Sequence, residues 1–235
     1  MKKMMFNERY GLEQATIAGY KTFTTRIIPD KNGLYRDMNH CNFIEIKGNQ
    51  IRIDFGNVVQ RCWTLPSYLP LPGEIVAIAQ SYGKIYNEMT SDVYVADSEE
   101  SAKLYFSYIL MDAHQSVFHD IKGWNNKMFV RANLMLHKIQ FENCRVEKMQ
   151  DITDEECLKE GIRLYTSGIP QCKTEVVDSN FDFIPPYGFD DYHHKHFCNF
   201  DNPREAFADL IDRISGKGTW KSNPFVLRYE YKKIC

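Results

Sequence analysis

The stretch from Arg145 to Gly161 constrains the fold more than any other part of the chain. It begins as a β-rich run, RVEKMQDI, and continues as a short helical run, TDEECLKEG. The Thr153 hydroxyl is placed to accept a hydrogen bond from the backbone N–H of Glu156, whose carboxylate can reach back to the N–H of Thr153 in a capping box. Gly161 supplies the left-handed residue that ends the helix. The stretch predicts a strand that leads directly into a capped helix.

The composition favours one domain with insertions. The chain has 235 residues, of which 43% are hydrophobic and 14% aromatic, and this is enough to bury one core of ordinary size. Its apolar runs are too short to span a bilayer, and its first residues lack the apolar stretch of a signal peptide. We therefore expect a single domain over residues 1–235 that is cytoplasmic and has no membrane partner.

The cysteine pattern and the net charge argue against two classes of protein: disulfide-stabilised proteins and proteins that bind duplex nucleic acid through its phosphates. Seven cysteines are scattered along the chain without a CxxC pair, which favours free buried thiols over a disulfide framework. The net charge is −2. A protein that grips duplex nucleic acid through its phosphates carries a marked basic excess, because counterion release drives that binding. A role in nucleic-acid chemistry would therefore rest on a local pocket for one base or nucleoside.

Apolar periodicity and turn residues predict an alternation of short helices and strands. Helices are predicted over residues 7–18, 98–111 and 203–215. Strands are predicted over residues 22–28, 43–47, 50–55, 74–80, 128–134, 138–141, 144–146 and 225–231. Short strands of this kind avoid exposed edges by curling into a closed barrel. We therefore predict an α+β fold, a small β-barrel with peripheral helices, a helical insertion at about 82–125 and an irregular loop at about 165–200.

The last predicted helix has clear signals at both ends. Asn202 is its cap, Pro203 occupies its first position and Gly216 ends it. Its predicted buried stripe consists of Ala206, Phe207, Leu210, Ile211 and Ile214.

The segment from Gly19 to Arg26 carries the first candidate site residues. In an extended segment Thr22, Thr24 and Arg26 share one face, and Lys21, Phe23 and Thr25 share the other. A turn or twist after Gly19 would bring the Lys21 amine beside Thr24. A lysine next to a threonine hydroxyl serves as a general base if burial lowers its pKa, or it donates to a carbonyl or phosphate oxygen. The alternative is a polar β-segment with an exposed lysine.

The run TWKSNPF, which ends at Phe225, carries the second set. Trp220 could stack on a base, since every base has a π-face, and Asn223 could bond a base edge. The alternative is that Trp220 fills the core and Asn223 caps a turn before the proline. The sequence leaves both interpretations open.

A histidine-rich run lies between His193 and Cys198. In an extended segment His194, His196 and Cys198 would share one face. Zinc sites usually draw their ligands from two separate elements that are rigidly held, whereas this run lies in an irregular acidic loop. We predict a solvated loop here, with no metal site, and we predict no cofactor elsewhere.

Together these motifs resemble the ASCH family, a relative of the PUA domains that is built on a small β-barrel. The family pattern Gly-x-Lys-x-x-Thr-x-Arg is matched at Gly19, Lys21, Thr24 and Arg26, and the run Trp-x-x-Asn-Pro-aromatic is matched from Trp220. The resemblance covers residues 10–28, 72–80, 126–161 and 202–231. It implies a PUA-like barrel, a ligand among RNA bases and modified nucleosides, and a stand-alone protein of bacterial or phage type.

One branch of that family hydrolyses acylated cytidines. By resemblance Lys21 would be the base and Thr24 the nucleophile, and the glutamate that serves as acid would fall on Gln140. An amide cannot donate a labile proton as a carboxylic acid does. The carboxylates that could replace it are Glu142, two residues on and on the same face, and then Glu74 and Glu147.

Three functions follow from this reading. The first is a module that binds RNA or a modified nucleoside in a polar cleft, lined by Lys21, Thr24, Arg26, Gln140, Trp220 and Asn223. The second is an amidohydrolase of acylated cytidine or a similar base amide, with Lys21, Thr24 and Glu142 as catalytic residues. The third is a protein-interaction module that uses the insertion at 82–125 and the acidic loop.

Overall fold

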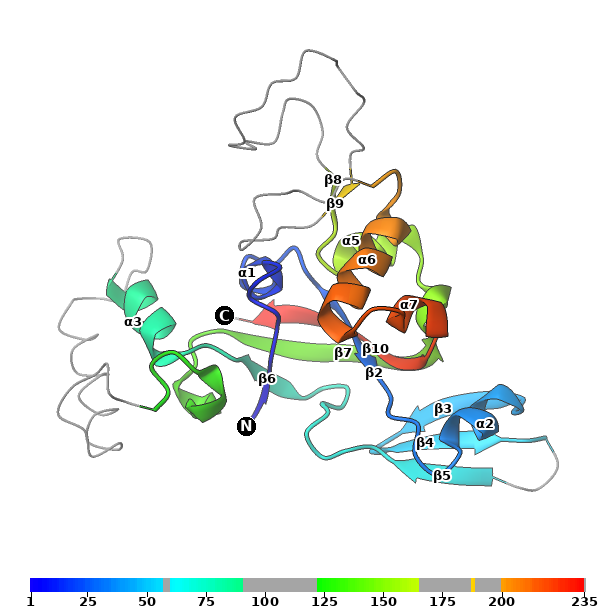
Figure 1. Ribbon diagram of the computed structural model, residues 1–235. Coiled ribbons are helices and arrows are strands. Elements are labelled where there is room, and N and C mark those ends of the chain that lie inside the picture. The colour runs from blue at the N-terminus through cyan, green and yellow to red at the C-terminus, as the bar shows by residue number, and fades with distance from the viewer. Residues whose placement is uncertain (57–59, 91–121, 165–186, 189–199, 235) are drawn as a thin grey trace, which may run out of the picture. The chain divides into compact units, whose positions relative to one another are not determined.

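The computed structural model describes residues 1–56, 60–90, 122–164, 187–188 and 200–234 (Figure 1). Its helices are α1 Leu12–Ile17, α2 Leu34–Asn39, α3 Tyr82–Thr90, α5 Asp154–Lys159, α6 Pro203–Ser215 and α7 Thr219–Ser222. Its strands are β1 Lys2–Met4, β2 Phe23–Ile27, β3 Phe43–Lys47, β4 Gln50–Asp54, β5 Gln60–Thr64, β6 Ile75–Ile78, β7 Lys138–Lys148, β8 Arg163–Leu164, β9 Tyr187–Gly188 and β10 Phe225–Ile234. Parallel and antiparallel strand pairs both occur, and the fold class is α+β, as predicted.

The chain divides into two compact units. The first consists of Met1–Phe6, Ile75–Ile139 and Ile234–Cys235, and the second of Asn7–Glu74 and Gln140–Lys233. The candidate site residues Lys21, Thr24, Arg26, Gln140, Glu142, Trp220 and Asn223 all belong to the second unit.

In the first unit β1 runs parallel to β6, and a small core forms around Ala79, Tyr82 and Ile85. The predicted strand over 128–134 is wrong, because the chain there forms two 3-10 turns, Lys127–Phe129 and Ala132–Leu134. The Lys3 amine donates to the backbone oxygens of Lys127, Met128 and Val130 at 3.0, 2.6 and 2.8 Å. These carbonyls are satisfied by one side chain and need no neighbouring strand.

In the second unit β7, β10 and β2 lie side by side in that order. β2 and β10 are antiparallel, with Ile27 opposite Val226 and Thr24 opposite Tyr229. Figure 1 shows α5, α6 and α7 grouped beside this sheet. β10 is buried on both faces from Phe225 to Tyr229, so its side chains are held from two sides.

The alternation of β7 slips by one residue. Phe141 packs its ring against Tyr229 at a centroid distance of 5.1 Å, whereas Glu147 forms an ion pair with Arg228. Arg228 and Tyr229 are successive in β10 and face opposite sides of the sheet, so their partners Phe141 and Glu147 face opposite sides as well. In a regular strand two residues six positions apart would lie on the same side. The exposed pair 142–143 marks the slip, which has the character of a β-bulge. The sequence predicted two strands here, and the structure has one.

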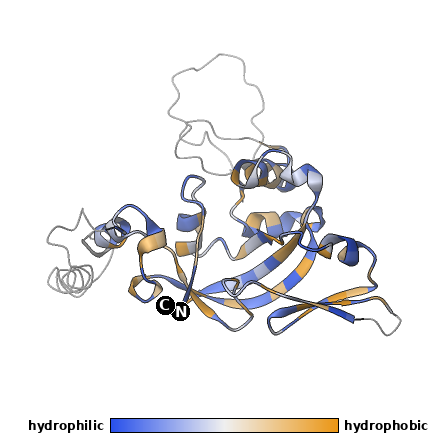
Figure 2. Ribbon diagram, turned by 60° about the horizontal axis from the view of Figure 1, so that its bottom comes forward, coloured by the Kyte–Doolittle hydropathy of each residue, from blue (hydrophilic) through white to orange (hydrophobic). Residues whose placement is uncertain are grey.

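Two smaller antiparallel sheets also belong to the second unit. One is the pair β8-β9, and the other is the three-stranded sheet β3-β4-β5, beside which Figure 1 shows α2. The predicted hairpin is confirmed, with Gly48 at φ +59° in its turn. Ile53 is fully buried and Leu34 of α2 is 4% exposed, while Arg61 donates to Asp37 at 2.7 Å. Hydrophobic and hydrophilic residues alternate along β4 and most of β3, as the colours of this sheet show (Figure 2). α2 and β5 were not predicted.

Several further predictions have clear outcomes. The Asn202 cap is confirmed, since its Oδ1 accepts from the Glu205 N–H at 2.9 Å. Ile214 does not belong to the buried stripe of α6, because it is 38% exposed in the last turn. The described cysteines are all free, but only Cys157 is buried and Cys62 is exposed. The predicted helix at 98–111 and most of the loop at 165–200 lie outside the described residues.

The described strands form open sheets, and no closed barrel is found among them. The PUA-like barrel therefore stays a prediction. Across the described ranges, no helix combines the length and the apolar character that crossing a bilayer requires.

Candidate functional site

A buried ion pair joins the start of β2 to the end of α5. Lys21 Nζ donates to Glu160 Oε2 at 2.5 Å, to the Glu160 backbone oxygen at 2.7 Å and to the Phe23 backbone oxygen at 2.6 Å. Lys21 is 2% exposed and Glu160 5%. The backbone N–H of Thr22 donates to the Lys159 oxygen nearby. Because a lysine amine has three N–H donors, these acceptors fix it fully.

A threonine hydroxyl completes this arrangement, and it belongs to Thr25. Thr25 Oγ1 donates to Glu160 Oε1 at 2.5 Å and accepts from Arg228 Nη1 at 3.2 Å. Lys21 and Glu160 are buried and Arg228 is 1% exposed, whereas Thr25 is half-buried. Thr25 is thus the most exposed residue of this group of four.

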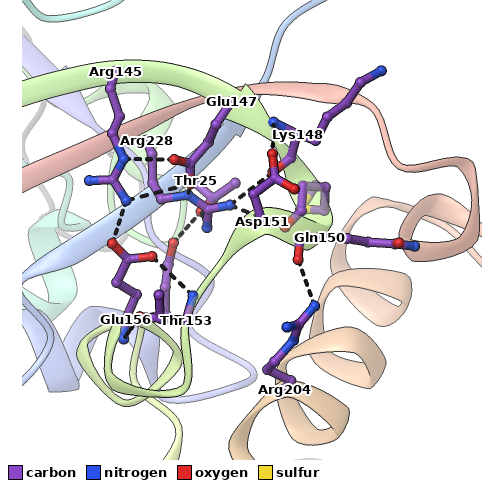
Figure 3. A network of polar contacts seen from close by, with 12 residues as sticks. Thr25, Arg145, Glu147, Lys148, Gln150, Asp151, Thr153, Glu156, Arg204 and Arg228 are labelled. Carbon is purple, nitrogen blue, oxygen red and sulfur yellow. Dashed lines mark hydrogen bonds and ion pairs between the residues drawn. The ribbon is translucent and has the colours of Figure 1, made fainter.

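Arg228 connects this group to the capped start of α5 (Figure 3). Its Nη2 donates to the backbone oxygens of Lys148 and Met149 at 3.3 and 3.1 Å, and its Nε forms an ion pair with Glu147. Glu147 also pairs with Arg145 at 2.7 Å. Arg145 in turn contacts Glu156, the residue that closes the predicted capping box with Thr153.

We call these side chains the polar cluster: Lys21, Thr25, Arg145, Glu147, Glu156, Glu160 and Arg228. Its cations and carboxylates are equal in number. Burial lowers the pKa of the Lys21 amine below its ordinary value, Glu160 opposes that shift, and nearby Arg26 adds to it. Buried ion pairs gain little over well-packed apolar residues, but removing one partner strongly destabilises a protein. We therefore expect removal of a buried charged member, Lys21, Glu160 or Arg228, to destabilise the fold strongly.

Thr24 and Arg26 lie on β2 but are not members of the polar cluster. Thr24 is 4% exposed and stands opposite Tyr229. Arg26 stands opposite Leu227, and burial lowers its pKa, which the negative charge of Glu160 partly offsets. The alternation of the strand puts Thr25, and not Thr24, on the side of Glu160.

The contacts described for the predicted acid positions are with groups other than the Lys21 amine. Gln140 reaches the backbone oxygen of Gly73 at 3.5 Å. Glu142 is exposed and pairs with Lys232 at 2.8 Å. Glu74 accepts from the Leu71 N–H at 2.8 Å, and Glu147 binds Arg228 within the polar cluster.

Trp220 and Asn223 lie at the other end of β10. The Trp220 ring meets Phe207 edge-on at 6.1 Å, and Asn223 Oδ1 accepts from the Gln150 N–H at 2.9 Å. β2 is paired so that the Tyr231 N–H donates to the Thr22 oxygen. Six residues of strand therefore separate the Lys21 end from the turn of Trp220, about 20 Å. The structure does not bring these two groups together.

Sequence patterns assigned no role in the site to Glu160, Thr25 or Arg228. The Lys21–Glu160 contact spans 139 positions along the chain, and the Thr25–Arg228 contact spans 203. Local patterns carry no signal for such pairs. The alternation of the strand already predicts Thr25 on the same side as Lys21, but the family motif assigned the role to Thr24.

The described residues contain no group of three or more His, Cys, Asp or Glu side chains that could hold a metal ion. The candidate ligands His194, His196 and Cys198 lie outside the described residues. Comparisons with protein-family models, curated proteins and solved structures find no match to this chain. The family resemblance therefore rests on the quoted motifs alone.

Proposed function

We propose that this protein is a PUA-like module of the ASCH type that binds RNA or a modified nucleoside, with the ligand at the Thr25 hydroxyl. The observation that carries the proposal is the half-buried Thr25 hydroxyl held between the buried Glu160 carboxylate and the Arg228 guanidinium. Sites that bind or react need groups fixed in position by supporting hydrogen bonds. Thr25 has that support from two oppositely charged neighbours.

The choice of ligand rests on the motif and on the charge of the chain. Gly19, Lys21, Thr24 and Arg26 match the ASCH pattern, which implies a nucleobase or nucleoside. The net charge of −2 gives little drive for binding through many phosphates. Recognition of one nucleoside, free or within a single strand, fits both observations.

Neighbouring threonines provide a matched test. Thr25→Val removes the hydroxyl but keeps the shape of the side chain, and Thr24→Val makes the same change one residue away. Equilibrium titration of modified nucleosides and short single-stranded RNA should show binding weakened about three- to tenfold in Thr25→Val, the worth of one hydrogen bond. Thr24→Val should bind as the wild type does. Equal binding by all three proteins would remove the proposal.

Lys21 is unsuited to this test. Its amine holds Glu160 and two backbone oxygens, so Lys21→Ala would leave a buried carboxylate unpaired and destabilise the fold. A loss of binding in that variant would not distinguish a missing ligand contact from a disturbed structure.

A second candidate is the hydrolysis of an acylated cytidine or a similar base amide. It is favoured by the line of contacts from the Thr25 hydroxyl to the Glu160 carboxylate and on to the Lys21 amine, each 2.5 Å long. A nucleophile, a base and a group that orients the base form the usual arrangement for covalent catalysis. Thr25 would attack the acyl carbon while Glu160 takes its proton and passes it to the leaving amine. Water would then release the acid from Thr25.

Incubation of the protein with N4-acetylcytidine, followed by chromatography, tests this candidate. Cytidine and acetate should form in equal amounts with the wild type and with Thr24→Val, and neither should form with Thr25→Val. Absence of turnover by the wild type would eliminate the hydrolase and leave the binding module. The third function, protein interaction through the insertion at 82–125, falls mostly outside the described residues.

A further inference from the structure

The strand β5 forms an open edge of the three-stranded sheet in the second unit. In the order β3-β4-β5 it pairs with β4 on one side only, and Figure 1 shows it at the rim of this sheet. Its residues are exposed except for Trp63, which is half-buried. An edge of this kind presents a row of N–H and C=O groups to which another strand can bond.

The register of β5 on β4 shows which of its backbone groups face that neighbour. Thr64 lies opposite Gln50, and one position further along, the Leu65 N–H donates to the Asn49 oxygen at 2.7 Å. Leu65 and Asn49 are therefore a hydrogen-bonded pair, and such pairs alternate with non-hydrogen-bonded pairs along an antiparallel ladder. Counting back from Leu65, every second residue of β5 turns its N–H and C=O groups toward β4, and the residues between turn theirs away.

The backbone groups that point away from β4 belong to Gln60, Cys62 and Thr64. In the described part of the chain, none of the backbone hydrogen bonds formed outside the helices and strands involves these residues. β5 also lacks the usual protection of an edge strand, since it contains no proline or lysine and its register with β4 runs without a bulge. The opposite edge strand, β3, carries exposed Glu45 and Lys47. β5 is therefore the edge of this sheet at which a further strand can be added.

The side chains of β5 are self-complementary about its middle residue. In an antiparallel pair of two β5 strands, Cys62 can lie opposite Cys62 of the partner subunit. Arg61, whose side chain is 50% exposed, then lies opposite the partner's Trp63, and Gln60 lies opposite the partner's Thr64. A guanidinium beside an indole ring forms a cation–π contact, and an amide beside a hydroxyl forms a polar cross-strand pair. A two-fold axis repeats both contacts, and no like charges face each other.

From this pattern we propose that β5 is a dimerisation edge, where a second copy of this chain adds its own β5 antiparallel across a two-fold axis. Each facing pair among Gln60, Cys62 and Thr64 exchanges both of its N–H···O bonds, and the two three-stranded sheets become one continuous sheet. The contact is small, so the dimer is weak and its population depends on concentration. The inference is independent of the ligand site proposed at Thr25.

Sedimentation velocity on the full chain, under reducing conditions and over about a hundredfold range of concentration, tests the proposal. The wild type should shift from monomer toward dimer as its concentration rises. Cys62→Ser should do the same, because the edge pairs through its backbone. A wild type that remains monomeric over the whole range would overturn the proposal.

Charges at position 62 test whether this edge is the interface. Cys62→Lys and Cys62→Glu each place two like charges directly opposite one another, so each protein alone should lose the dimer. An equal mixture of the two proteins should regain it, because opposite charges then face each other across the axis. Lys47→Glu, on the opposite edge strand, is the control and should dimerise as the wild type does. Wild-type dimerisation by Cys62→Lys, or a mixture that stays monomeric, would contradict the edge.

Oxidation provides a second measurement of the same contact. The two Cys62 Cα atoms of such a pair lie about 5.5 Å apart, a distance that suits a disulfide. Added diamide takes up the electrons and protons of the two thiols, and the wild type should give a covalent dimer on a non-reducing gel. Cys41→Ser should crosslink as the wild type does, and Cys62→Ser should not. Equal crosslinking by Cys62→Ser would show that other thiols meet and would contradict the proposal.

Discussion

Arg228 is the residue on which the polar cluster depends most. It is 1% exposed and binds Thr25, Glu147 and two backbone oxygens at once. Burying the guanidinium charge costs desolvation free energy, which the contacts with partners on β2 and β7 offset. Arg228 therefore both stabilises the fold and holds the Thr25 hydroxyl in position.

Two arginines allow a direct comparison of buried and exposed ion pairs. Arg228→Met leaves Glu147 and the backbone oxygens without this partner and should lower the free energy of unfolding by about 3–5 kcal/mol. Arg213 pairs with Asp209 on the surface of α6 at 2.6 Å, and Arg213→Met should cost about 0.5 kcal/mol or less. Urea unfolding of the three proteins measures both values. Similar costs for the two variants would show that Arg228 is not held as described.

Cys157 makes stability sensitive to alkaline pH. Burial, together with the carboxylates of Glu160 and Asp154, raises the pKa of its thiol from 9.0 to about 12. The unfolded chain then loses this proton at lower pH than the folded chain. Stability must fall as pH rises from about 9 toward about 12, because the unfolded state binds fewer protons in that window.

The variant Cys157→Ala should lose its share of this pH dependence. Its free energy of unfolding is expected to fall less than that of the wild type between pH 9 and pH 12, on top of a constant loss from the smaller side chain. Cys62→Ala, at an exposed position, should follow the wild-type profile. Parallel profiles for wild type and Cys157→Ala would refute this account of the thiol.

At the residue scale, the sequence predicted part of the candidate site. Lys21 was singled out, and its amine does meet a carboxylate, Glu160, whose other oxygen accepts from the Thr25 hydroxyl. The motif pointed to Thr24, whereas the backbone geometry of β2 presents Thr25 to the same group. The carboxylate comes from the end of a helix 139 positions away. Spacing along the chain predicts local faces, but it does not predict which distant element docks against them.

At the element scale, predictions held where the chemistry is local. The capping box at the start of α5 is present, with Thr153 Oγ1 accepting from Glu156 N–H at 3.2 Å and the Glu156 carboxylate accepting from Thr153 N–H at 3.1 Å. The failure at 128–134 has a distant cause, since Lys3 satisfies carbonyls that a strand would have offered to its neighbour. Short runs rich in apolar residues look alike in sequence, whichever group satisfies their backbone oxygens.

Gly161 positions the end of α5 against β2. It has φ +106°, and an added Cβ would lie 3.1 Å from Leu12 and 3.6 Å from the Lys21 side chain. Gly216 at the end of α6 has the same φ of +106°, with no atom within 4 Å of the added Cβ. Comparing Gly161 with Gly216 therefore separates two costs of an added side chain: the strain of the positive φ, which both positions share, and the clash with neighbours, which only Gly161 has.

Alanine at each of these glycines gives the corresponding test. Gly216→Ala should lower the free energy of unfolding by about 1–2 kcal/mol, the cost of a side chain at positive φ. Gly161→Ala should cost clearly more, because Leu12 and Lys21 must move as well. Denaturant titration measures both, and equal costs would mean that the contact between α5, α1 and β2 is looser than described.

At the scale of the whole molecule, the α+β class followed from the mixture of periodicities, and the structure confirms it. Closure of a sheet into a barrel cannot be predicted from local patterns in the same way. It requires the first and last strands of a sheet to meet, which no local pattern specifies, and the described strands form open sheets. The barrel therefore remains a prediction, and the family resemblance remains one because no comparison finds a match.

The net charge of −2 leads to a prediction about nucleic-acid binding. If the ligand is one nucleoside within a strand, few phosphates are neutralised. The affinity for short single-stranded RNA should then fall less than about tenfold between about 50 and 200 mM salt. Fluorescence anisotropy at several salt concentrations measures this slope. A loss of about 10³ or more would indicate an extended phosphate-binding surface instead of one pocket.

The central claim is that the ligand meets the protein at the Thr25 hydroxyl, which Glu160 and Arg228 hold in place. The most direct measurement is the dissociation constant of modified nucleosides for wild type, Thr25→Val and Thr24→Val under one set of conditions. The account predicts affinity weakened about three- to tenfold in Thr25→Val alone. If Thr25→Val kept the wild-type affinity and Thr24→Val bound more weakly, the Thr25 site would be contradicted. The ligand would then contact the opposite face of β2, at Thr24.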